Sequence, residues 1–211
     1  LLEDFGLGAD IKQQAQARAD DAGGSGPSRL ARIPLQREKE QEMTPEEYEE
    51  AASYWIRKDA TSKALPADDA RALVDAFLAS HNTCALATRA GALVRCTPLE
   101  HAWHAGAVWI LSEGGLKFRA LASNPKVCLA VYEPYSSMGQ THGLQVMGTA
   151  EVIDESDPAY TSELATKGVT PERLAALGMR IHLLRITPQS CDLLDSDLRK
   201  KGFEARQHLD L

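Results

Sequence analysis

A chain of 211 residues is long enough for one substantial domain with appendages, because single domains usually hold about 100 to 200 residues. Its 23 basic against 30 acidic side chains give a formal net charge of −7, and no local basic patch offsets this balance, which argues against a nucleic-acid partner. No apolar run approaches the roughly 18 residues of a membrane span, and the start lacks the basic-then-apolar order of a secretory signal. We therefore expect a cytoplasmic protein with no membrane partner.

Residues 1–42 have no sustained hydrophobic period, and the stretch DDAGGSGPSR within them has the composition of a flexible linker. This pattern predicts a flexible or partner-docked N-terminal extension, followed by one domain over residues 43–211 with two leading helices. Because the first residue is leucine, we expect the translation start to lie upstream of this sequence.

The first predicted helix runs from Thr44 to about Asp59. Thr44 can cap it, Pro45 suits the first helical position and Glu47 can return a hydrogen bond to the cap. The apolar residues at three-and-four spacing predict one buried stripe. They are Tyr48, Ala51, Ala52, Trp55 and Ile56.

A second amphipathic helix is predicted over residues 67–80, after Pro66. Its inward-facing residues are Leu73, Val74, Phe77 and Leu78, and acidic residues lie near its positive end. His81 and Asn82 end it.

Strand-like runs follow at residues 84–88, 93–103, 107–112, 127–132 and 144–153. The first three are joined by short glycine-containing turns, RAG and HAG, which favour hairpins and a meandering antiparallel sheet. Alternation along residues 93–103 is poor, so we expect both faces to be covered, one by a barrel interior and the other by a ligand or second subunit. Pro98 cannot donate to a ladder, which predicts an edge or a bulge there.

The remaining chain is predicted as helices over 157–167 and 171–178 and a strand over 181–187. Pro188 is expected to turn the chain before a short strand over 191–194. The charged residues after it are expected to form a surface tail.

The four cysteines lie at positions 84, 96, 128 and 191 without a CxxC pair, and three of them fall in apolar, β-like runs. A free thiol in such a run behaves as a small hydrophobic group. The sequence predicts reduced, buried cysteines, with a disulfide or a metal site as the alternative.

The turn after the strand at 107–112 has the components of a phosphate site. Ser112 offers a hydroxyl, Gly114 and Gly115 let backbone N–H groups approach an anion, and Lys117 supplies a positive charge. The segment matches neither GxxxxGK[ST] nor GxGxxG, so an ordinary turn before a helix remains the alternative.

The histidines do not predict a metal site. His101 and His104 are three apart on a strand and point to opposite faces, so we expect structural roles, with a single haem ligand or substrate contact as the alternative. His142, in the loop before the last of the central strands, is the histidine most favoured to lie near a ligand.

Several pieces of sequence occur in an order that resembles a known family. They are CALATRAGALVRCTPLEHAWHAGAVWILS, the lysine-bearing helix ending in ASNPKVCLAVY, then LQVMGTAEVI and RITPQSCDLL. This order resembles the FMN-binding split-barrel family that includes pyridoxamine 5'-phosphate oxidase. The resemblance implies a mainly β, α+β fold with flanking helices, built on a six-stranded antiparallel split β-barrel. It also implies a homodimer with FMN at each end of the subunit interface.

The resemblance implies that Lys117 and Ser112 hold the FMN phosphate, that one strand lies along the flavin, and that Gln145 reaches it from a neighbouring strand. Leu116 stands where the family usually has an arginine. The implied cofactor-binding residues are Arg95, Cys96, Thr97, Pro98, Leu111, Ser112, Leu116, Lys117 and Gln145.

The chain end departs from pyridoxamine phosphate oxidases proper, whose R-L-H-D-R pattern grips the substrate. Here Arg199, Arg206 and His208 have a different spacing, which argues against pyridoxamine phosphate as the substrate. The leading hypothesis is an FMN-dependent oxidoreductase acting with a small-molecule substrate or electron donor, whose chemistry resides on the cofactor. The alternatives are a non-catalytic FMN- or haem-binding or electron-transfer protein, and a split barrel that has lost its cofactor and serves as an interaction module.

Overall fold

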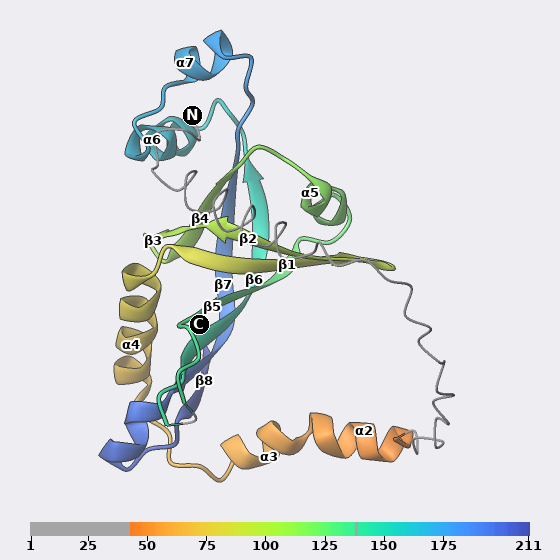
Figure 1. Ribbon diagram of the computed structural model, residues 1–211, viewed down its shortest axis with the longest axis vertical. Helices are drawn as coiled ribbons and strands as arrows, with labels where there is room; N and C mark the ends of the chain where they lie inside the picture. The colour runs from red at the N-terminus through yellow and green to blue at the C-terminus, as the bar shows by residue number, and fades with distance from the viewer. Residues whose placement is uncertain (1–42, 138) are drawn as a thin grey trace, which may run out of the picture. The chain divides into compact units, whose positions relative to one another are not determined.

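The computed structural model describes residues 43–137 and 139–211, and the predicted extension over residues 1–42 lies outside the described residues. Short helices flank one antiparallel sheet (Figure 1). The helices are α2 (Pro45–Ala52), α3 (Tyr54–Asp59), α4 (Ala67–Ser80), α5 (Leu116–Leu121), α6 (Pro158–Thr166), α7 (Pro171–Ala176) and the 3-10 helix η1 (Ser196–Lys201). The strands are β1 (Thr83–Ala90), β2 (Leu93–Glu100), β3 (Ala102–His104), β4 (Ala107–Ser112), β5 (Lys126–Tyr132), β6 (His142–Ile153), β7 (His182–Asp195) and β8 (Arg206–Asp210).

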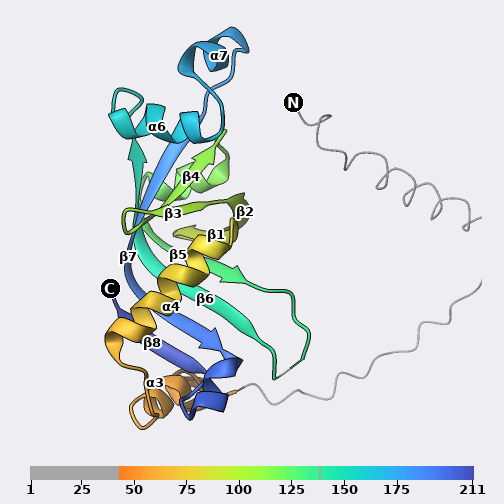
Figure 2. The same ribbon diagram turned by 90° about the vertical axis from the view of Figure 1, so that its left-hand side faces the viewer.

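The sheet runs in the order β2-β1-β5-β6-β7-β4-β3, with β8 added to β7. Its two ends, β2 and β3, are consecutive in the chain and are separated only by His101. The sheet therefore curls until its two edges meet at one residue (Figure 2). This confirms the predicted split-barrel class, with eight strands in place of six.

The predicted hairpins at the two glycine turns are confirmed, because β1 pairs with β2 and β3 pairs with β4. A simple meander is wrong, since β5 returns to pair with β1 and β7 returns to pair with β4. The single strand predicted over residues 93–103 is divided at His101, whose backbone N–H donates to the carbonyl of Asn82, the residue before β1.

The predicted break at Pro188 is also wrong, because β7 continues through it. Pro188 lies opposite Gly148, where the register between β6 and β7 shifts. On its other side, β4 covers β7 only as far as Ile186 and β8 begins at Ser190, so the missing N–H falls in a gap between neighbours. A bulge at such a gap lets a proline lie inside a strand.

The chain end is a structural part of the sheet, which overturns the predicted surface tail. Strand β8 pairs with the second half of β7, and its residues alternate between buried and accessible positions. Leu198, Ala205 and Leu209 are buried. The period-two pattern of RQHLD was therefore a strand signal, although its charges suggested a solvated segment.

Helix α4 forms one side of the main core and lies beside the sheet in both views (Figures 1 and 2). Ala70, Val74 and Leu78 are buried against the strands, and Leu73 and Phe77 pack partly against the same cluster. The predicted helix and its inward face are confirmed. A smaller core forms where Tyr160 and Leu164 of α6 and Leu174 of α7 pack on Trp109 of β4.

The predicted buried stripe of the first helix is wrong. The helix is divided at Ser53, and neither α2 nor α3 contains a buried residue. Tyr48 is 63% exposed and Ile56 is 73% exposed. The apolar spacing is present, but no described part of this chain covers that side.

All four cysteines are free thiols, as predicted, but only Cys84 and Cys191 are buried. Burial raises the pKa of Cys84 to about 12 and that of Cys191 to about 11. Cys96 is exposed and Cys128 is half-buried, which corrects the prediction that the cysteines are buried. Among the described residues, no helix is both long enough and apolar enough to cross a membrane.

Candidate functional site

The turn between β4 and α5 folds Ser112, Gly114 and Lys117 onto one another. The Gly114 N–H donates to Ser112 Oγ at 3.3 Å, and the Lys117 ammonium donates to the Gly114 carbonyl. Gly114 has φ +135° and Gly115 has φ +102°, values that side chains other than glycine rarely adopt. The two glycines therefore permit the tight turn that brings the lysine back to the serine. We call Ser112, Gly114, Gly115 and Lys117 the cradle.

Lys117 is the unusual member of the cradle, because its charge is enclosed. The residue is only 5% exposed, and burial lowers the pKa of its ammonium. Its hydrogen bond to Gly114 uses one of its three N–H donors, and within the described residues it has no carboxylate partner. An enclosed ammonium without a counter-ion favours an anionic ligand.

Helix α5 lies against β1 and β2, which places two further polar side chains on the neighbouring elements. Thr88 of β1 is 2% exposed, and its hydroxyl has no hydrogen-bond partner among the described residues. Arg95 of β2 is directly opposite Thr88 in the register, is exposed, and has no ion pair in the described part of the chain. These elements therefore hold a second unpaired cation and an unsatisfied hydroxyl.

The four candidate residues of β2 divide between the two faces of the sheet. Arg95 and Thr97 share the inward face with Thr88, whereas Cys96 and Pro98 share the outward face with Ala87. Because β2 is the last strand in the sheet order, Pro98 lies at an edge, as predicted.

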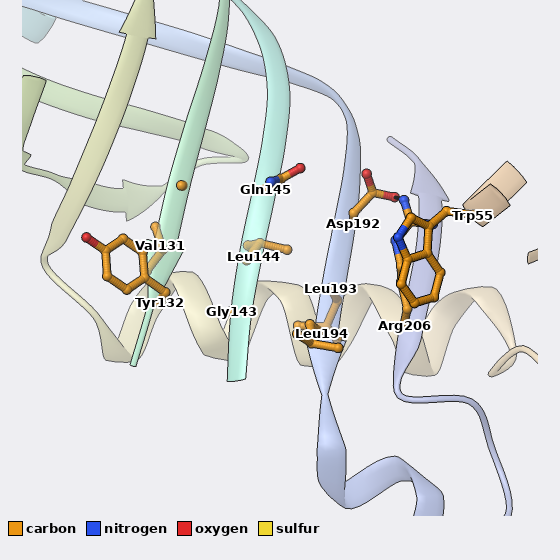
Figure 3. Close-up of a pocket in the computed structure, with 11 residues that line it drawn as sticks. Trp55, Val131, Tyr132, Gly143, Leu144, Gln145, Asp192, Leu193, Leu194 and Arg206 are labelled. Atoms are coloured by element: carbon orange, nitrogen blue, oxygen red, sulfur yellow. Dashed lines mark ion pairs between the residues drawn. The ribbon is translucent and has the colours of Figure 1, made fainter. Parts of the chain in front are cut away.

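Gln145 lies elsewhere, in a pocket on the outward face of β5, β6 and β7 (Figure 3). The cavity measures about 440 Å³. Trp55 and Arg206 close its far side, and the Arg206 guanidinium lies 5.3 Å from the Trp55 ring. Arg206 also makes ion pairs with Asp59 and, at 2.9 Å, with Asp192. No cradle residue lines this pocket.

The other two candidates flank the cradle. Leu111 is half-buried and packs on the smaller core, away from Ser112. Leu116, the first residue of α5, is 44% exposed. The structure thus brings Ser112 and Lys117 together, places Arg95 on an adjacent element, and leaves Gln145 at a different pocket.

His182 is a neighbour of the cradle that the sequence did not indicate. It is directly opposite Ser112 where β7 pairs with β4, and its ring lies 4.8 Å from that of Phe118 in α5. It lines a second cavity of about 440 Å³ with Tyr160 and Arg180. His182 is brought to the cradle by the pairing of β4 with β7. The spacing of residues in the sequence does not reveal which strands pair, so this neighbour could not be predicted.

His101, between β2 and β3, and His104, at the end of β3, have different environments. His101 is 3% exposed, and neither ring nitrogen has a hydrogen-bond partner among the described residues. Burial lowers the pKa of the His101 ring. His104 stacks on Trp109 with ring centroids 5.4 Å apart and lies 2.9 Å from Glu163. These contacts hold His104 against β4 and α6, and its structural role stays a prediction.

The curled antiparallel sheet defines a split barrel. The enclosed Lys117, which follows β4, gives this barrel a candidate anion site. The sequence model of the pyridoxamine 5'-phosphate oxidase family matches residues 70–190, more than half of the chain. The chain belongs to this family.

Solved structures share the fold at low sequence identity. ChuZ from Campylobacter jejuni is 18% identical with a TM-score of 0.53, over 77% of this chain and 68% of that one. A conserved hypothetical protein from Mycobacterium tuberculosis is 18% identical with a TM-score of 0.50, over 72% of this chain and 94% of that one. The haem storage protein HutZ from Vibrio cholerae is 18% identical with a TM-score of 0.45, over 56% and 88% of the two chains. The first two likenesses show a common fold alone. No curated protein matches the chain.

Proposed function

We infer that this protein is an FMN-dependent oxidoreductase that holds the flavin phosphate at the cradle. Lys117 carries the proposal, because an enclosed ammonium with unused donors and no carboxylate partner suits a phosphate dianion. Ser112 and Arg95 provide a hydroxyl and a second cation on elements next to it. Membership of the pyridoxamine 5'-phosphate oxidase family supports FMN as the phosphate-bearing ligand.

The bound flavin would supply the electron transfer to or from a small-molecule substrate or donor. The protein would bind and orient it. Lys117 and Arg95 would neutralise the phosphate, while the free edge of β2 at Pro98 leaves backbone groups available to the ring system. The cytoplasmic location expected from the sequence stays a prediction.

We further propose that a second copy of the chain completes the site. The outward face of β1 and β5 carries the small side chains Ala85, Ala87, Cys128 and Ala130, all partly exposed, and Met147 beside them is 46% exposed. Such a small-residue surface suits close packing against another sheet. The cradle residues do not line the pocket that holds Gln145, and we propose that a flavin contacting both would use residues from two copies.

The visible absorption spectrum of the purified protein tests the cofactor, repeated after adding FMN and, separately, haem. We expect a flavin spectrum that is lost in Lys117→Met and retained in Arg119→Met, which removes an exposed cation from the same helix. Full flavin occupancy in Lys117→Met would show that the cradle does not bind the flavin phosphate. A Soret band without flavin uptake would move the function to haem.

A non-catalytic binder of flavin or haem is the second candidate, and the chain end favours it. Arg206 is held by Asp59 and Asp192, and His208 Nδ1 lies 2.8 Å from Asp192. Both side chains are engaged by carboxylates of the same chain and are not free to grip a substrate. Flavin that stays oxidised under anaerobic nicotinamide or dithiol reductants would support this candidate, and rapid bleaching followed by reoxidation in air would contradict it.

A further inference from the structure

His142 lies among three carboxylates where β6 begins and β7 ends. It begins β6 and is directly opposite Asp195, the last residue of β7. Its Nδ1 lies 3.0 Å from Glu133 Oε2. Its Nε2 lies 3.5 Å from Asp195 Oδ1 and 3.7 Å from Asp197 Oδ2.

The two distances at Nε2 are longer than those of typical hydrogen bonds, which span about 2.7–3.2 Å. They match the separation of neighbouring ligands around a metal, since a tetrahedron with bonds of about 2.1 Å has edges of about 3.4 Å. The Glu133 carboxylate can only accept a hydrogen bond, so its contact engages Nδ1 and leaves Nε2 as the ring nitrogen that faces the two aspartates.

We propose that His142 Nε2, Asp195 and Asp197 form a binding site for one divalent metal ion, with Zn²⁺ as the fitting ion. The three ligand atoms lie within 4.8 Å of one another. An imidazole with two carboxylates is a donor set that Zn²⁺ accepts, and a three-ligand zinc site keeps one position open. The site is distinct from the cradle and does not depend on the proposed function.

Surrounding contacts already orient the ligands. Glu133 stands in the place of the carboxylate that accepts the second ring N–H of a metal-bound histidine. Ser196, between the two aspartates, is 6% exposed and exchanges two hydrogen bonds of 3.1 Å with the Thr141 backbone, next to His142. Lys200 occupies Asp197 Oδ1 at 2.6 Å and leaves Oδ2 for the metal.

A cavity gives access to the open position. It measures about 310 Å³ and is lined by His142 and Asp195 together with Phe77, Ser80 and Leu193. A water or a small anionic ligand entering from this side would complete the coordination. The ligands come from β6, β7 and η1, so the metal would also tie the start of β6 to the chain end.

Titration of the metal-free, tag-free full chain with Zn²⁺ tests the proposal, with Co²⁺ absorption reporting the coordination geometry. We expect one ion per chain and loss of that binding in His142→Ala and Asp195→Asn. Glu133→Gln leaves all three ligands in place and is expected to weaken binding about 10- to 100-fold. This variant keeps the test decisive if the others fail to fold.

His208 provides a matched control. It lies between Asp192 and Asp210, at 2.8 and 3.8 Å, but Asp210 is 95% exposed in its side chain and the described residues offer no third ligand there. His208→Ala is therefore expected to leave Zn²⁺ affinity unchanged. No saturable binding at micromolar Zn²⁺, or equal affinity in His142→Ala and wild type, would overturn the site.

Discussion

Lys117 shows how much a single side chain can reveal once its burial is known. Sequence reasoning identified the turn from Ser112 to Lys117 by its glycines and its lysine, and the structure brings these residues together. Sequence could not show that the ammonium is enclosed without a carboxylate. That depends on how α5 lies against β1 and β2, which are distant in the chain.

The first prediction concerns the pH dependence that Lys117 gives to stability. Because burial lowers its pKa from 10.5, the unfolded chain binds more protons just below that value, and stability without ligand should rise with pH there. Lys117→Met should remove this rise and leave the ligand-free protein as stable as wild type or more stable near pH 7. Melting curves between pH 7 and 10 measure both effects, and a strongly destabilised Lys117→Met would show that the ammonium is structurally satisfied.

The second prediction concerns His101. Burial lowers its pKa below the ordinary 6.5, so the folded state keeps it neutral while the unfolded state gains a proton. The contribution of neutral His101 to the free energy of unfolding should be complete above about pH 6.5. Below that pH the free energy of unfolding should fall by up to about 1.4 kcal/mol per pH unit, until the pKa of the folded state is reached. His101→Leu should flatten this acid limb in denaturant titrations. An unchanged limb would assign acid sensitivity to other groups.

At the scale of elements, the errors of sequence reasoning have local causes. Pro188 suggested a turn, but the strand passes through it because the register shifts at Gly148 and the neighbours of β7 change there. The charges of the last residues hid the alternation of β8. In contrast, α4 was predicted correctly, since its apolar stripe packs on strands of the same chain.

The third prediction follows from the close approach at Gly148. A Cβ there would lie 2.6 Å from the Thr187 carbonyl oxygen and 3.1 Å from Ile186 Cγ2. Since the first of these is backbone, β6 and β7 must separate, and Gly148→Ala should cost about 1–3 kcal/mol of unfolding free energy. Gly139→Ala is the control, because a Cβ at Gly139 meets nothing within 4 Å. Equal denaturation midpoints for the two variants would contradict the tight crossing.

At the scale of the whole molecule, sequence predicted the split barrel but assigned α2 and α3 a buried stripe that the described chain does not cover. Periodicity reports which residues share a face, and it does not report whether the covering surface belongs to the same chain. The same reasoning applies to the outward face of β1 and β5, for which we propose a second copy.

The fourth prediction tests that face. Ala87 is half-buried and lies between Cys96 and Cys128 in the register of three strands. If a second copy packs there, Ala87→Arg should give a monomer by light scattering and lose flavin together with the dimer. Ala79→Arg, on an exposed position of α4, should do neither. A wild-type monomer at micromolar concentration would end the proposal.

Strand β7 pairs with β6 on one side, and with β4 and then β8 on the other, apart from the gap around Pro188. Outside that gap, its amides cannot be freed without separating distant parts of the sheet. In deuterated solvent they should be among the last to lose their protons, at a rate set by global unfolding. The amides of the edge strand β2 should exchange much earlier. We therefore expect the side of the barrel next to the cradle to open locally while β7 remains paired.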